Sequence, residues 1–169
     1  TSTLTGAVEE TAMTIARFHK TNNETISGNK TPIDDLTNSS GSHGFVSRGT
    51  QPTNSSGTLT LPSTGLWRVD AFFGIYTANA HSYLYGQIVY STDSGSNYNG
   101  ACTAYQELAQ GNGGSLTTTY CHINCYTILN CTNASTFRLR FHAGGDGSNF
   151  LLRDGVNTNF LIQKIGSSQ

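Results

Sequence analysis

Side chains that transfer protons or act as nucleophiles are scattered through this chain rather than gathered into a motif. The chain has ten acidic residues, and its five histidines are His19, His43, His81, His122 and His142. There is no Gly-x-Ser-x-Gly segment to present a nucleophilic serine. The adjacent acid pairs, Glu9-Glu10 and Asp34-Asp35, would face opposite sides of a strand and make poor dyads for glycoside hydrolysis. We therefore expect surface or interface histidines, no catalytic residues and a non-enzymatic protein.

The four cysteines have some appearance of a metal site but suit other roles better. They are Cys102, Cys121, Cys125 and Cys131. The last three share parity, so an unbroken strand would place them on one apolar face, where a free thiol behaves as a small hydrophobe. The Cys-x-x-Cys pairs typical of zinc sites are missing. Free thiols, one or two disulfides, and a metal site all stay open, in that order of preference.

Two loops carry polar groups that suit ligand contacts. Asp146, flanked by glycines, offers oxygen for calcium, but it is more simply a turn residue, and we expect no metal or cofactor. The loop Asp93–Gly100 presents Asn97, Tyr98 and Asn99, which we name as a hypothetical outer contact for carbohydrate or a receptor.

The elements that would position these groups are β-strands. The segment Gly57–Tyr76 holds two alternating patterns on either side of a Pro-x-x-Gly turn, and period-two alternation is typical of a half-buried strand. After the turn, one face would carry Trp67, Val69, Ala71, Phe73 and Ile75. The other face carries Leu66, Phe72 and Tyr76, and large aromatics on both faces indicate packing on both sides, such as a second subunit.

Similar alternating runs follow along most of the chain. Beside 66–78, we predict strands at 11–19, 33–36, 45–47, 81–92, 103–109, 116–129, 136–143, 150–152 and 158–165, with 11–19 also suiting a short helix. Many short strands without a confident helix predict an all-β, two-sheet antiparallel sandwich or jelly roll. We expect a flexible N-terminal arm over residues 1–10 and a single domain over 11–169.

Composition narrows the class of partner. Charged residues make up 11% of the chain and the net charge is −1, so there is no basic patch for nucleic acid. No apolar run approaches the ~20 residues of a membrane span. A surface of Ser, Thr, Asn, Gly and Tyr is typical of extracellular and virion-exterior β proteins.

Three segments resemble the globular heads of tumour-necrosis-factor-like and complement-type proteins. These are the strand-turn-strand 58–69, the run 136–141 with the glycines that follow it, and the closing strand 158–165. The resemblance implies a ten-stranded jelly roll that assembles as a bell-shaped homotrimer. It also implies that inner-sheet aromatics pack against neighbouring subunits. Our predicted interface residues are Phe72, Tyr76, Tyr83, Tyr85 and Phe160.

That family includes soluble ligands, complement heads and structural heads on viral particles. Our leading hypothesis is a capsid decoration protein of a bacteriophage, assembled in the host cytoplasm and exposed on the virion surface. The arm would bind the major capsid protein, and the Thr1 start suits a small self-contained protein after removal of Met. The alternatives are the head of a fibre that binds a host glycan or receptor, and a secreted complement-type ligand.

Overall fold

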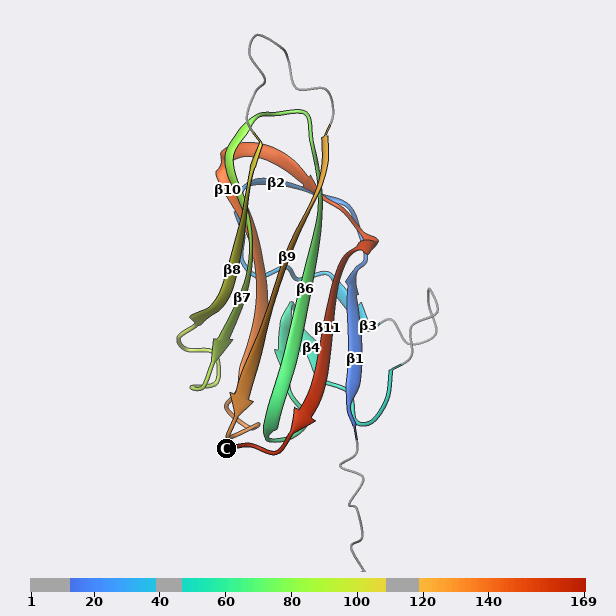
Figure 1. Ribbon diagram of the computed structural model, residues 1–169, viewed down its shortest axis with the longest axis vertical. Coiled ribbons are helices and arrows are strands. Elements are labelled where there is room, and N and C mark those ends of the chain that lie inside the picture. The colour runs from blue at the N-terminus through green and yellow to red at the C-terminus, as the bar shows by residue number, and fades with distance from the viewer. Residues whose placement is uncertain (1–12, 39–46, 109–118) are drawn as a thin grey trace, which may run out of the picture.

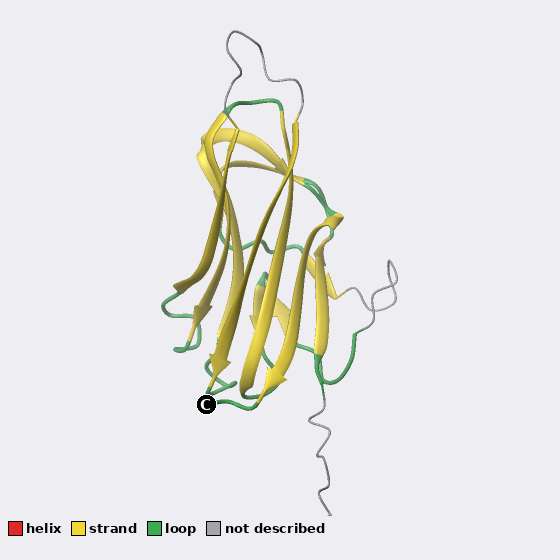
Figure 2. Ribbon diagram, viewed as in Figure 1, coloured by secondary structure: helices red, strands yellow, loops and turns green. Residues whose placement is uncertain are grey.

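The computed structural model describes residues 13–38, 47–108 and 119–169, which form strands and loops. The eleven strands are β1 (Ile15–Lys20), β2 (Glu24–Lys30), β3 (Leu36–Asn38), β4 (Thr53–Ser55), β5 (Thr58–Thr60), β6 (Gly65–Thr77), β7 (His81–Ser91), β8 (Asn99–Leu108), β9 (Thr119–Cys131), β10 (Arg138–Leu152) and β11 (Gly155–Gly166). Figure 2 shows that strands and short connections account for the described chain. Within these ranges, no helix has the length and apolarity to cross a bilayer.

The strands lie in two antiparallel layers. Sheet I has the order β3-β1-β11-β6-β9, and Figure 1 shows β1, β11, β6 and β9 side by side. Sheet II contains β4-β5-β10-β7-β8, with β2 also paired to β10. Strand β10 joins the layers, because its last residues pair with β6, as at Leu151 and Tyr76. The predicted all-β antiparallel architecture is confirmed.

The alternation in β6 builds the core. Trp67, Val69, Ala71, Phe73 and Ile75 are all at most 1% exposed, as their shared parity predicted. Their burial against sheet II removes a large apolar area from water, which is the main favourable term in folding. The remaining parity of β6 therefore lies on the outer side of sheet I.

Strand β9 shows the same division. Cys125 and Cys131 are buried and Cys121 is half-buried, with Ile123 and Leu129 beside them on the core side. All four cysteines of the chain are free thiols. The prediction that the thiols follow one apolar face of this strand is confirmed.

The structure differs from the predicted local structure at several places. Strand, rather than helix, is correct for the first element, β1, although it begins at Ile15, after the expected start, and ends one residue later than expected. The glycine run 144–147, expected as a loop between two strands, lies inside the single strand β10, where the register to β2 shifts between Gly144 and Asn149. That shift is a bulge, which glycine accommodates without ending the strand. The predicted arm 1–10 and most of the strand 45–47 lie outside the described residues.

Candidate functional site

The outer side of sheet I carries a row of large exposed side chains from β6 and β9. We call this set the aromatic face; its members are Phe72, Tyr76, Tyr120, Tyr126 and Ile128. Phe72 is 38% exposed, Tyr120 60%, Tyr126 72% and Ile128 58%. A contiguous exposed patch of this kind on a folded chain marks an interaction surface.

The register of β6 and β9 explains why these side chains gather. Tyr76 lies directly opposite Tyr120, and their rings are 4.9 Å apart. The guanidinium of Arg153 lies 5.1 Å from the centre of the Tyr120 ring, a cation–π contact that holds the ring at one end of the face. Cross-strand aromatic pairs of this type stabilise a sheet and order its surface.

A hollow of about 450 Å³ lies at the middle of this face, between β1, β11, β6 and β9. Its walls include Phe72, Tyr126 and Leu161, and its polar lining includes an ion pair, with Arg68 Nε 3.0 Å from Asp70 Oδ2. Asp70 is only 8% exposed, so the carboxylate is largely removed from water beside its partner. The aromatic face is therefore concave at its centre. The polar groups in the hollow would fix the orientation of a bound partner.

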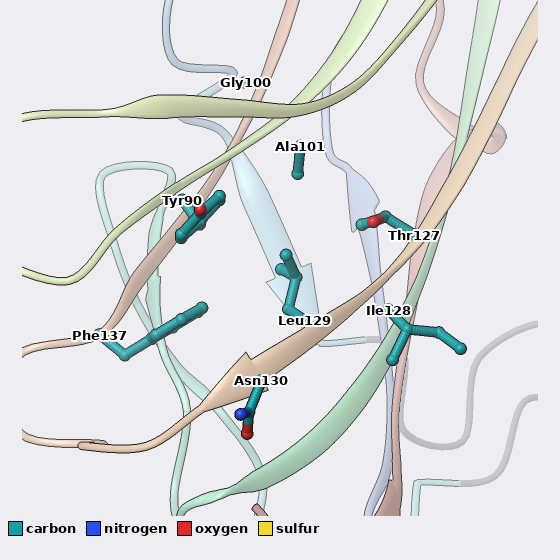
Figure 3. Close-up of a pocket in the computed structure, with 8 residues that line it drawn as sticks. All are labelled: Tyr90, Gly100, Ala101, Thr127, Ile128, Leu129, Asn130 and Phe137. Atoms are coloured by element: carbon teal, nitrogen blue, oxygen red, sulfur yellow. The ribbon is translucent and has the colours of Figure 1, made fainter. Parts of the chain in front are cut away.

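A second concave surface lies where the two layers end. Strand β9 pairs only with β6 and β8 only with β7, so each is an edge strand among the described residues. The edge groove between them encloses about 360 Å³ and is lined by Tyr90, Gly100, Ala101, Thr127, Ile128, Leu129, Asn130 and Phe137. Figure 3 shows the side chains of Tyr90, Phe137 and Leu129 around this opening. Ile128 joins the groove to the aromatic face, so the two surfaces are continuous.

The five predicted interface residues do not form one surface. Phe72 and Tyr76 lie on the aromatic face, whereas Tyr83 and Tyr85 lie on the outer side of sheet II, next to Tyr105. Phe160 is 0% exposed and packs between the layers, so on this chain it is a core residue. The alternation of residues along a strand did not show that Tyr76 of β6 and the tyrosines of β7 would belong to different sheets. Tyr120 and Tyr126 were missed, although their alternation with the cysteines in β9 was a usable signal.

No protein-family model matches this sequence, and no curated protein matches it. Solved structures do match. The Eiger TNF structure from S. frugiperda aligns with 94% of this chain and 96% of its own, at a TM-score of 0.66 and 14% identity. Murine APRIL at pH 5.0 aligns with 89% of this chain and 99% of its own, at a TM-score of 0.61 and 7% identity. Murine APRIL at pH 8.5 gives a TM-score of 0.59 at 6% identity, over 90% and 99% of the two chains.

The fold is the tumour necrosis factor jelly roll. The resemblance read from the sequence is thereby confirmed at the level of fold. Identities of 6–14% carry no residue roles across, so the surfaces described above stand on their own geometry.

The predicted outer contact loop of this TNF-like jelly roll is largely folded on itself. Asn97 donates from its side chain to Asp93 Oδ2 at 2.7 Å and from its backbone to Asp93 Oδ1 at 3.0 Å. The Ser91 hydroxyl and these Asn97 groups hold the pKa of Asp93 well below its usual range. The ring of Tyr98 lies under Arg140, 4.1 Å from its guanidinium carbon, and its buried hydroxyl has no hydrogen-bond partner among the described residues. Asn99 is exposed and pairs with Tyr90 at the start of β8.

A hydroxyl, an imidazole and a carboxylate do line up at the β6–β7 connection. Thr77 Oγ1 lies 3.0 Å from His81 Nε2, and His81 Nδ1 lies 3.1 Å from Asp146 Oδ1. Thr77 is 2% exposed and also hydrogen-bonds the backbone around Asn79, which makes it a poor nucleophile because no substrate reaches it. We interpret the row as a structural clamp. The expectation of a surface or interface histidine is wrong for His81, which is 1% exposed.

A cluster of carboxylates near β2 is engaged by lysines. Glu24, Asp34 and Asp35 bring oxygen atoms within 4.8 Å of one another. Lys20, which is fully buried, contacts Glu24 and Asp35, while Lys30 contacts Glu24 at 2.9 Å and Asp34 at 3.0 Å. Each carboxylate already pairs with an ammonium group, so the cluster has the chemistry of an ion-pair network rather than of a cation site.

Proposed function

We propose that this chain is a non-enzymatic structural protein that assembles as a homotrimer through sheet I. The observation that carries the proposal is the aromatic face, whose exposed Phe72, Tyr126 and Ile128 would be costly to leave in water. The resemblance to tumour-necrosis-factor-like heads supplies the trimeric state, and the shaped hollow on the same face supports a specific contact.

The contact that fits this molecule is heterologous. One chain presents two different apolar surfaces, the aromatic face and the edge groove, and they meet at Ile128. If the face of one copy packs against the groove edge of the next, repetition around an axis closes a ring. Such packing would also cover the open edges of β8 and β9, which otherwise invite uncontrolled strand pairing.

Within that class we propose a capsid decoration protein of a bacteriophage. A trimer would match the local three-fold positions of a capsid lattice, with residues 1–10 as the attachment to the major capsid protein. The four free thiols support assembly in a reducing cytoplasm, because nothing in the core depends on an oxidised pair. The low charge of the chain suits an exposed virion surface.

A secreted TNF-type ligand is the second candidate, since the fold fits it about as well. One observation favours it: Cys102 and Cys125 are neighbours across the two layers, and Cys102 contributes to the raised pKa of Cys125. An oxidising compartment would allow that pair to form a disulfide. A fibre head would share the trimer and differ in carrying a receptor site.

Light scattering on the full chain tests the assembly. We expect a mass near three times 18.1 kDa, and a Tyr126→Arg variant that stays folded with the mass of one chain. Tyr105→Arg is the matched control, because Tyr105 is 68% exposed on the opposite sheet and should leave the mass unchanged. If the native chain is monomeric at all concentrations, the homotrimer proposal is wrong. Co-sedimentation of trimers with and without residues 1–10 on undecorated phage capsids then separates the decoration protein from the secreted ligand.

A further inference from the structure

A second aromatic cluster lies on the outer side of sheet II, away from the proposed assembly surface. We call Tyr83, Tyr85 and Tyr105 the tyrosine platform. Tyr105 is 68% exposed and Tyr83 41%. The ring of Tyr105 lies 6.3 Å from that of Tyr83 and 6.1 Å from that of Tyr85. The proposed assembly uses the aromatic face and the edge groove, which reaches β8 at Gly100 and Ala101 rather than at Tyr105, so it would leave this platform in solvent. The exposure of the platform therefore needs a different explanation.

The backbone beneath the platform is adapted to it. Gly144 lies next to Tyr85 in the β10–β7 pairing and next to Asn29 in the β10–β2 pairing. A Cβ at Gly144 would overlap both the Tyr85 ring and the side-chain Oδ1 of Asn29, so only glycine lets the ring lie over the sheet. The Tyr85 hydroxyl donates to Asn29 Oδ1 at 3.2 Å, which fixes the ring at its outer end.

The border of the platform includes neutral hydrogen-bonding groups, and Glu107, which follows Tyr105 on the same side of β8, adds a carboxylate. Asn29 lies on one side, and Gln87 donates to Thr103 Oγ1 at 3.0 Å on another. Burial and the neighbouring tyrosines raise the pKa of Tyr85, so its phenol stays protonated at neutral pH. His142, two residues before Gly144, is also neutral there, because burial and the nearby Arg140 lower its pKa to about 4. Arg140 itself is held by Tyr98 and Thr58.

We propose that the tyrosine platform binds a neutral glycan. Apolar ring faces suit the C–H faces of pyranose rings, and the amides and hydroxyls of the border suit sugar hydroxyls. Among the described residues, the platform and its border offer no cation to pair with the carboxylate of an acidic sugar, and burying that carboxylate unpaired would cost binding. A neutral, β-linked glycan, whose equatorial substituents leave flat C–H faces, is therefore the matching ligand.

Binding of lactose, cellotetraose and 3′-sialyllactose to the full chain tests this proposal by titration calorimetry and saturation-transfer NMR. We expect saturable binding of at least one of the two neutral glycans and weaker binding of the sialylated one. Tyr105→Ala should weaken the neutral glycan about tenfold, and Tyr105→Phe, which keeps the ring, should weaken it less.

Tyr98→Ala is the matched control, since it removes a tyrosine from the β7–β8 connection, where the ring lies under Arg140 and outside the platform, and should leave affinity unchanged. The proposal is overturned if neither neutral glycan binds, if 3′-sialyllactose binds more tightly than both, or if Tyr98→Ala abolishes binding while Tyr105→Ala does not. Light scattering on the same samples distinguishes failure of this proposal from failure of the trimer proposal. A variant that loses glycan binding but keeps its mass has lost only the function of the platform.

Discussion

The ring of Phe160 stacks on the ring of Phe141, with centroids 3.7 Å apart and planes 8° from parallel. Phe160 comes from β11 in sheet I and Phe141 from β10 in sheet II, so the pair joins the two layers at the centre of the core. Phe73 meets the Phe160 ring edge-on at 5.5 Å. The residue that a closing-strand motif suggested for an interface thus holds the single chain together.

Replacing Phe160 with Ala should lower the free energy of unfolding by ~3–5 kcal/mol, because the variant loses a buried ring and leaves a cavity. Guanidinium titration monitored by Trp67 fluorescence measures the change. Val156→Ala is the control on the same strand; Val156 is 50% exposed, so its loss should stay within ~0.5 kcal/mol. Equal losses in the two variants would show that Phe160 is not a core residue.

Gly86→Ala should also destabilise the chain, by ~1–3 kcal/mol, through overpacking rather than a cavity. A Cβ at Gly86 would overlap the fully buried ring of Phe73, which has no free space to move into. Gly166→Ala is the matched control, because its Cβ would meet only the Leu66 side chain, at ordinary contact distances of 3.6 and 3.9 Å. The same chemical denaturation experiment compares them, and a neutral Gly86→Ala would contradict the packing described across the two sheets.

Much of the fold was predictable because period-two alternation acts locally. The burial of the odd residues of β6 and β9 follows from the pleat once each strand is recognised. The glycine run in β10 was misread because glycine marks both loops and bulges, and only the paired strands decide between them.

The site was harder to predict, because its surfaces depend on which strands become neighbours. Tyr83 and Tyr85 have the same aromatic alternation as Tyr76, yet they belong to the other sheet, and no local pattern records that. His81 was misassigned to the surface or an interface for a similar reason: its partner Asp146 lies 65 residues away in sequence. Long-range pairs of this kind are set by topology, not by the residues on either side.

The Asp146 clamp predicts an acid-dependent loss of stability. Hydrogen bonds from the Ser82 backbone and hydroxyl to the Asp146 carboxylate lower its pKa to about 2. A carboxyl whose pKa is depressed in the folded state stabilises the protein above its unfolded value of 3.8, and that contribution is lost as the pH falls toward 2. Asp146→Asn should therefore have a lower urea midpoint than the native chain at pH 7, and the difference should shrink between pH 4 and pH 2.

Ser82→Ala tests the same clamp more gently. It removes the hydroxyl donor, 2.9 Å from Asp146 Oδ2, and leaves the backbone donor at 2.6 Å. We expect a smaller fall in the urea midpoint at pH 7 than Asp146→Asn gives. If the gap between Asp146→Asn and the native chain stays constant from pH 7 to pH 2, the carboxylate is not the titrating group.

The thiols give the last prediction, because their reactivity follows burial and charge. Burial, and then the neighbouring Cys102, raise the pKa of Cys125 to about 12, and burial also raises the pKa values of Cys121 and Cys131. Only the thiolate reacts with alkylating agents. Reagent access then decides the order: in the native chain at pH 8, iodoacetamide should label the half-buried Cys102 and Cys121 before the buried Cys125 and Cys131, and peptide mass spectrometry measures each site.

Oxidised glutathione extends the same experiment to the compartment in which the protein works. Transfer of two hydrogens from Cys102 and Cys125 to glutathione disulfide would leave one protein disulfide and two glutathione thiols, and block both cysteines to alkylation. If that disulfide raises the melting temperature, the oxidised form is compatible with the native packing, and the secreted ligand gains support. If it forms only in denaturant or lowers the melting temperature, the native core is built for reduced thiols, as a protein assembled in the cytoplasm requires. Cys102→Ser, which cannot form this bond, should show neither change.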